Sequence, residues 1–255
     1  MAVFLTGDTH GDFSRLRRES FYEQDGLGKE DFLLVCGDFG GLWYGDGRDD
    51  DALDWLERRP FTTLFVDGNH ENFDALNRLP VQNWHGGRVH ALRPSVLHLM
   101  RGEVFALEGR RWFVMGGARS HDIEGGILEP DDPRRKERER RLRRHYLSYR
   151  VNHESWWAQE LPDEAEYANA RANLDRCGWQ VDEIVTHCAP TGVQRQLSDL
   201  YGPDALTDFL EEVRGRCRFR HWFFGHYHDN RSLLGGFTLL YEQIVPLGRG
   251  EGGSR

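Results

Sequence analysis

The chain has 255 residues, of which 38% are hydrophobic and 29% are charged, a composition that is ordinary for a soluble globular protein. Its net charge of −9 disfavours a general nucleic-acid coat protein, and no apolar run approaches the roughly 18 residues of a membrane span. The length predicts one domain over residues 1–247, followed by a polar, glycine-rich tail over 248–255 that we expect to be flexible.

The first 80 residues alternate between strand-like and helix-like segments, which is the pattern of a βαβ layer. The strand-like runs are hydrophobic, and each ends in a polar cluster: Ala2–Gly11, Phe32–Gly41 and Thr63–Glu71. The segments between and after them predict helices over Phe13–Arg18, Asp50–Arg59 and Phe73–Leu79.

The middle of the chain changes character. Short alternating runs over 88–115, mostly separated by Gly or Pro, predict antiparallel strands, and a glycine-rich loop follows over 116–126. Helices are expected over 134–150 and 154–177, the second interrupted at Pro162. Together they predict a helical, arginine-rich insert over about 130–178.

The last third returns to strands. A strand is expected over about 181–186, within the run Glu183–Pro190, and another within the run His221–His228. A helix is predicted between them over Pro203–Val213, because proline suits the first turn of a helix. A closing hairpin is predicted over 233–240.

Five of these runs carry Asp, Asn or His where the strand ends. In an open α/β sheet the carboxyl ends of the strands converge on one crevice, so these side chains are expected to meet in space. They are Asp8 and His10, Asp38, Asn69 and His70, His187, and His226 and His228. The sequence therefore predicts a metal site, and the number of ligands suits two cations.

The ligand types indicate the chemistry. Asp8 and His10 are two apart, as are His226 and His228, and in extended backbone such side chains point the same way. The carboxylate of Asp38 has two oxygens with which to bridge two cations. A set of nitrogen and oxygen ligands without thiolate favours Mn, with Fe, Zn or Co as alternatives. Two such cations clamp the attacking and leaving oxygens of a displacement at phosphorus.

The motifs GDTHG, GDFGG, GNHE, THCAP and GHYH occur in that order between Asp8 and His228. Together they resemble the five signature blocks of the calcineurin-like metallophosphoesterases. The resemblance implies an α/β fold with a central β-sandwich flanked by helices and the active site at the carboxyl ends of the strands. It also implies that Asp8, His10 and His228 hold one metal, that Asn69, His187 and His226 hold the other, and that Asp38 bridges them. His70 would contact the substrate phosphate as general acid or electrostatic stabiliser.

The implied activity is metal-dependent hydrolysis of phosphoesters by a metal-activated hydroxide, with phosphomonoesterase activity favoured. Gly40–Tyr44 stands where the protein serine/threonine phosphatases of this superfamily have an arginine. This difference weakens the hypotheses of a protein phosphatase and of a dinucleoside-polyphosphate hydrolase. The main alternative is a phosphodiesterase or nuclease acting on nucleotides or nucleic acid. A non-catalytic binding module and a nucleic-acid-binding protein without catalysis are two further hypotheses.

Substrate contacts are less specific in the sequence. Arg119, in the glycine-rich loop, is the leading candidate for a phosphate clamp, with a solvated loop arginine as the alternative. Trp43 and Tyr44 suit base stacking and core packing equally. The arginine-rich segment Pro133–Arg150 suits a phosphate-rich partner such as nucleic acid, although its interleaved charges are more typical of a solvated helix.

Other polar residues are assigned no chemical role. His90, His98, His145 and His153 are expected to be surface or hydrogen-bonded histidines, and Asp12, Asp67 and Asp74 to cap helices or turns. The four cysteines form no C-x-x-C pair, so neither a zinc knuckle nor a disulfide framework is expected. The start of the chain has no basic segment of a secretion signal, and together these features favour a cytoplasmic location.

Overall fold

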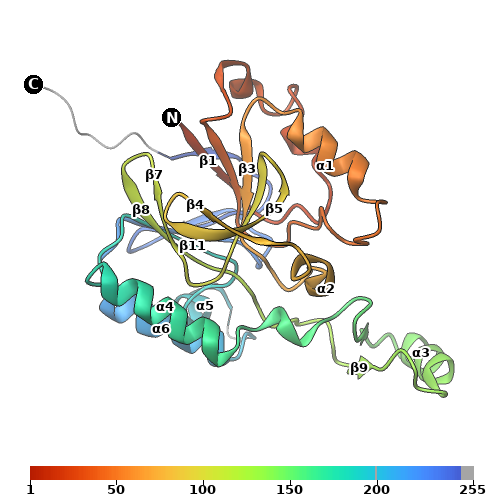
Figure 1. The fold of residues 1–255 in the computed structure, drawn as a ribbon. Coiled ribbons are helices and arrows are strands. Elements are labelled where there is room, and N and C mark those ends of the chain that lie inside the picture. Colours follow the sequence, from red (N-terminus) through yellow and green to blue (C-terminus); the bar gives the residue numbers. More distant parts are fainter. Residues whose placement is uncertain (199, 248–255) are drawn as a thin grey trace, which may run out of the picture.

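Two β-sheets pack face to face in the computed structural model, which describes residues 1–198 and 200–247. The packing surface between them contains apolar side chains from both sheets, including Leu5 and Leu34 from the first and Trp112, Val185 and Phe223 from the second. Helices cover the outer faces (Figure 1). This arrangement confirms the predicted α/β fold with a central β-sandwich flanked by helices.

The first sheet has the strand order β15-β1-β2-β3-β6-β5-β4. Its central strands β1, β2, β3 and β6 are parallel, and β4, β5 and β15 run antiparallel to their neighbours. The strands are β1 (Val3–Thr6), β2 (Phe32–Val35), β3 (Thr62–Phe65), β4 (Val81–Trp84), β5 (Gly87–Arg93), β6 (Val96–Leu99) and β15 (Val245–Pro246).

The second sheet has the order β13-β14-β12-β11-β8-β7, again with parallel strands in the centre and antiparallel strands at both edges. Its strands are β7 (Val104–Leu107), β8 (Arg110–Met115), β11 (Glu183–Thr186), β12 (His221–Phe224), β13 (Arg231–Leu233) and β14 (Phe237–Leu239). The predicted antiparallel strands over 88–115 and the closing hairpin are therefore confirmed.

The helices form the outer layers. Helix α1 (Asp50–Glu57) lies against the first sheet, and α4 (Glu164–Arg176), α5 (Thr191–Leu197) and α6 (Ala205–Arg216) lie against the second (Figure 1). Helix α2 (Phe73–Leu76) follows the polar loop after β3. Helix α3 (Arg135–Arg144) stands away from the sandwich, on a small extension that also holds the two-stranded sheet of β9 (Ile127–Leu128) and β10 (Arg150–Val151).

Several predicted helices are shorter in the structure. In place of a helix over 13–18 there is one 3-10 turn at Ser14–Leu16, because Asp12 accepts a hydrogen bond from the Ser14 amide and closes a tight turn. Helix α3 ends at Arg144 instead of 150, and α2 ends at Leu76 instead of Leu79. Helix α5 was not predicted, since seven residues with an internal glycine give little periodicity.

The helix predicted over 154–177 forms only in its second part. Residues 154–157 make a turn in which Ser155 Oγ accepts a hydrogen bond from the Val151 amide, and a 3-10 turn spans Ala158–Glu160. Pro162 keeps the preceding residue extended, and α4 begins after it with a capping box between Asp163 and Glu166. Helix α4, which lies within the predicted insert, packs into the core beneath the second sheet. The limits of the insert and of the single domain stay a prediction. The expected tail over 248–255 lies outside the described residues.

Candidate metal centre

The five polar motifs meet at one edge of the sandwich. Each follows the carboxyl end of a parallel strand: β1, β2 and β3 in the first sheet, and β11 and β12 in the second. Asp8, Asp38 and His187 are among the most buried polar side chains of the described chain, while His10 and His228 are partly exposed. The centre thus combines a buried part, made by Asp8, Asp38 and His187, with a more exposed part, made by His10 and His228.

Asp8, His10 and His228 form the first group of potential ligands, with all three ligand atoms within 4.8 Å of one another. His228 Nε2 lies 3.2 Å from Asp8 Oδ2 and 3.2 Å from His10 Nε2. Asp8 Oδ2 is buried and, within residues 1–198 and 200–247, accepts no hydrogen bond of good geometry. A buried carboxylate oxygen that lacks a donor and faces two imidazole nitrogens suits a cation.

Asp8, Asp38 and His187 form a second such group. His187 Nε2 lies 3.3 Å from Asp38 Oδ1 and 3.3 Å from Asn69 Oδ1. The other oxygen of Asp38, Oδ2, lies 3.8 Å from His10 Nε2 in the first group. The two oxygens of one carboxylate therefore face the two ligand groups, which is the geometry that a bridging ligand requires.

His226 sits beside these groups without joining either. Its backbone amide donates a hydrogen bond of 3.0 Å to Asp8 Oδ1, and its ring centroid lies 5.0 Å from that of His187. Its Nε2 is 2.8 Å from Nε2 of His121, a residue that the sequence analysis did not select. His226 as a metal ligand stays a prediction.

The backbone around the site is specialised. His10, Asp38, His226 and His228 all have positive φ, between 46° and 71°. Such left-handed conformations cost energy in residues with a side chain and cluster at functional sites. Close approach also demands glycine at position 68, where a Cβ would lie 2.0 Å from Asp38 Oδ1.

Charges in the pocket keep Asp38 ionised. Burial alone raises the pKa of a carboxyl group, but His187, His70 and His10 together lower the pKa of Asp38 well below its usual range. Burial lowers the pKa of His70, and the charge of Asp38 only partly offsets this. Asp38 is therefore held in the form that binds cations.

Comparison with known proteins agrees with this geometry. The family model described as calcineurin-like phosphoesterase matches residues 1–230. The chain belongs to the calcineurin-like phosphoesterase family. It is accordingly a hydrolase that acts on phosphoesters, and the family generally uses a dinuclear centre of divalent metal ions, for which the two ligand groups above are candidates.

Curated relatives of this phosphoesterase include lariat debranching enzymes. The one from Danio rerio is 26% identical over 51% of this chain and 24% of the relative, and the one from Homo sapiens is 27% identical over 51% and 25%. The aligned part thus covers about a quarter of the length of these relatives. Among the described residues of this phosphoesterase, no helix is both long and apolar enough to cross a membrane.

The glycine-rich loop contributes a contact that the sequence analysis missed. Asn69 Nδ2 donates a hydrogen bond of 3.3 Å to Ser120 Oγ, and Ser120 Oγ in turn donates one of 2.5 Å to Glu160. With its nitrogen committed to Ser120, the amide of Asn69 turns its oxygen toward His187. No local pattern reveals this contact, because residues 69, 120 and 160 meet only in the folded phosphoesterase.

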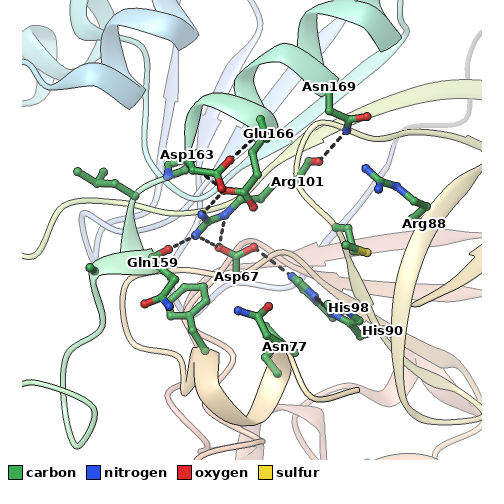
Figure 2. Close-up of a pocket in the computed structure, with 17 residues that line it drawn as sticks. Asp67, Asn77, Arg88, His90, His98, Arg101, Gln159, Asp163, Glu166 and Asn169 are labelled. Atoms are coloured by element: carbon green, nitrogen blue, oxygen red, sulfur yellow. Dashed lines mark hydrogen bonds and ion pairs between the residues drawn. The ribbon is translucent and has the colours of Figure 1, made fainter. Parts of the chain in front are cut away.

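A second missed network supports the loop between β3 and α2. Asp67 is buried and pairs with Arg101, whose Nη2 lies 2.6 Å from its Oδ2, and with His98 Nε2 at 3.0 Å (Figure 2). Arg101 also contacts Glu166 on α4 at 3.1 Å. The prediction that Asp67 caps a helix or turn is therefore wrong, because its carboxylate neutralises a buried guanidinium next to the loop that carries Asn69.

The other unassigned residues behave largely as expected. Asp12 closes a turn, and His90 and His98 are buried and hydrogen-bonded to each other. Asp74 lies in the first turn of α2, but its carboxylate accepts a hydrogen bond from Trp157 and interacts with His153. These contacts tie the segment after β10 to α2.

Two arginines approach the centre from the extension and its loop. Arg119 is exposed beside Ser120, and it is near enough to His121 to lower the pKa of that residue, although burial of His121 has the larger effect. Arg150 pairs with Asp122, and the charges of both reach His70. The role of Arg119 as a phosphate clamp stays a prediction.

Proposed function

We propose that this chain hydrolyses phosphoesters at a pair of cations, with Asp8, His10 and His228 holding one, Asn69, His187 and His226 holding the other, and Asp38 bridging. The observation that carries the proposal is the placement of Asp38, whose two oxygens face His10 and His187 separately. When bound, such cations stabilise negative charge on the phosphate and make a strong nucleophile available near neutral pH. Manganese is the metal that we favour, with iron, zinc or cobalt as alternatives.

We assign to His70 the role of assisting the departure of the leaving group. Its ring lies 5.4 Å from the ring of His10, centroid to centroid, and its backbone amide donates to Asp38 Oδ1 at 2.8 Å. The backbone hydrogen bond holds the residue in place, and His70 lines the same cavity as His10. From there it stabilises the transition state or passes a proton to the departing oxygen.

A phosphodiester, of a nucleotide or of nucleic acid, is the substrate class we propose in preference to the monoester that the sequence favoured. A diester needs room on both sides of the phosphorus, and a cavity of about 480 Å³ opens beside His10 and His70. The lariat debranching enzymes among the relatives give a second, independent support.

A test compares p-nitrophenyl phosphate with bis(p-nitrophenyl) phosphate, after elemental analysis of the purified protein and addition of Mn, Fe, Zn or Co. We expect metal-dependent turnover that is faster for the diester. Faster turnover of the monoester would return the preference to phosphomonoesterase activity, and full activity of D38A would overturn the two-cation proposal itself.

The exposed cations of α3 support nucleic acid as a partner. Within residues 1–198 and 200–247, no acidic group lies within ion-pair distance of five exposed cations on α3 or directly before it: Arg134, Lys136, Arg140, Arg141 and Arg144. Tyr146, directly after the helix, is 95% exposed. Free cations beside an exposed aromatic ring suit a single-stranded nucleic acid, which offers phosphates and bases together.

We propose a cytoplasmic location as well. The four cysteines are free thiols in the structure, as expected for a reducing compartment: Cys36, Cys177, Cys188 and Cys217.

A further inference from the structure

The cavity beside His10 and His70 has a second wall, formed by the loop after β2. Trp43, Tyr44 and Arg48 line this wall, and Phe13 contributes to the lining. The volume of about 480 Å³ lies within the range of small-molecule pockets. Because one wall is formed by a metal-ligand candidate and by His70, a group that occupies the cavity lies next to the reacting phosphate.

The loop holds its aromatic residues in place. The buried carboxylate of Asp49 accepts hydrogen bonds from the backbone amides of Tyr44 and Gly45, at 2.9 and 2.7 Å. Asn72 Nδ2 donates one of 2.6 Å to the carbonyl oxygen of Trp43, whose ring meets Trp157 edge-on with centroids 5.8 Å apart. A pocket wall that is ordered before binding loses little entropy when a ligand arrives.

The wall has the chemistry of a stacking site. Tyr44 is 49% exposed, and the guanidinium of Arg48 lies over its ring with Cζ 3.7 Å from the centroid. Arg48 donates two parallel hydrogen bonds to Asp46, from Nε to Oδ1 and from Nη2 to Oδ2. Trp43 is only partly buried, although it is a large aromatic residue. Planar aromatic and guanidinium groups that face solvent together stack readily on a flat ring.

We propose that this cavity binds the nucleobase of the substrate, which makes nucleoside phosphoesters the substrate class. The inference rests on the proposed function, since it seats the phosphate at the metal centre and the base one sugar away, against Trp43 and Tyr44. In the sequence, these two residues suit base stacking and core packing equally. Their position on the wall of a cavity shared with His10 and His70 favours stacking.

One experiment compares substrates that differ only in the base. The pairs are AMP with ribose 5-phosphate, and the dinucleotide ApA with its analogue that lacks both bases. Stacking on one aromatic side chain is typically worth a factor of about 5 to 150. We expect W43A and Y44A to lower kcat/KM for AMP or ApA by such a factor, while kcat/KM for the baseless partner changes less than about twofold. W43F should restore most of the loss.

Matched variants control for fold and charge. Tyr22 is 72% exposed and does not line the cavity, so Y22A is the control for Y44A. Arg18 pairs with Asp25 much as Arg48 pairs with Asp46, so R18A is the control for R48A. Equal loss for both members of a substrate pair, or no loss in Y44A and R48A, would overturn the base site while leaving phosphoester hydrolysis intact.

A binding measurement separates the two proposals. Saturation-transfer NMR with adenosine, which carries no phosphate, reports the base site without any turnover. We expect contact signals from the adenine protons in the wild type and their loss in W43A. If these signals appear but no phosphoester is hydrolysed with any added metal, the proposed function fails and the base site stands. If adenosine gives no signal that depends on Trp43, the base site fails.

Discussion

The side-chain nitrogen of Asn69 donates a hydrogen bond of 3.3 Å to Ser120 Oγ, and this contact decides which way the amide of Asn69 faces. Only with the nitrogen on Ser120 does the oxygen point at His187, 3.3 Å from its Nε2. Ser120 is in turn held by Glu160, which belongs to the segment before α4. The segment before α4 thus orients Asn69, the ligand candidate of the GNHE motif.

Replacement of Ser120 by Ala should therefore weaken metal binding. Outer contacts that orient metal ligands are typically worth about 10- to 100-fold in affinity, and we expect a loss in this range. The measurement is the Mn concentration that gives half-maximal activity, supported by calorimetric titration of the metal-free protein. S155A is the control, because Ser155 holds the Val151 amide in the same extension. Equal affinity of S120A and wild type would contradict the role of Ser120.

Replacements of Asp38 and His70 should differ in their effect on metal. Asp38 faces both ligand groups, so D38A is expected to lose metal and at least about 100-fold in kcat. H70A should keep its metal content and lose about 10²- to 10⁴-fold in kcat, the usual contribution of a general acid. Elemental analysis of each purified variant, together with steady-state kinetics, checks the difference. Loss of metal in H70A would show that His70 is needed to build the site.

Much of the centre could be predicted from the sequence, for a physical reason. Asp, Asn and His are common metal ligands, and the carboxyl ends of parallel strands bring such residues together. Residue type and strand pattern therefore suffice to bring Asp8, Asp38 and His187 to one site. The structure places these together as expected. The β-sandwich flanked by helices follows from the same strand pattern and from the family resemblance.

The supporting residues could not be predicted in this way. The contact of Asn69 with Ser120 joins residues 51 positions apart, and that of Asp67 with Arg101 joins residues 34 apart. Neither has a periodic signal, because each contact joins loops that come together only when the chain is folded. Short elements such as α5 and the 3-10 turn at Ser14–Leu16 escaped prediction because local hydrogen bonds decide them.

Helix α3 gives a prediction about salt. Arg140, Arg141 and Arg144 are exposed and project from the extension. If each contacts one phosphate of a single strand, their replacement by Ala should reduce the slope of log K against log salt concentration by about 2. Binding of a fluorescent RNA oligonucleotide at several salt concentrations measures this slope.

The matching control for α3 is the triple variant R17A/R58A/R218A, which removes the same charge from exposed positions elsewhere. Hydrolysis of bis(p-nitrophenyl) phosphate should stay unchanged in both triple variants, since it needs no extended contact. An identical salt slope in the α3 variant and in the control would show that α3 is only a solvated helix.

The His90–His98 pair gives a prediction about pH. His90 Nδ1 and His98 Nδ1 lie 3.1 Å apart, and His98 Nε2 faces Asp67 on its other side (Figure 2). Burial and the neighbouring His98 lower the pKa of His90 to about 4, whereas an unfolded histidine titrates near 6.5. Between these values the unfolded chain binds more protons than the folded one, so the free energy of unfolding falls as pH falls.

The effect should begin as pH drops through about 6.5 and be complete below about 4. We expect the free energy of unfolding to fall by about 1 kcal/mol between about pH 7 and pH 5. This is less than the whole pKa shift of His90 would give, because solvent screens part of the effect. Urea unfolding at both pH values measures the loss. In H90Q, where the amide still reaches His98 but does not titrate, the difference between the two pH values should shrink by about that amount. An unchanged pH dependence in H90Q would mean that other groups, and not His90, cause the acid sensitivity.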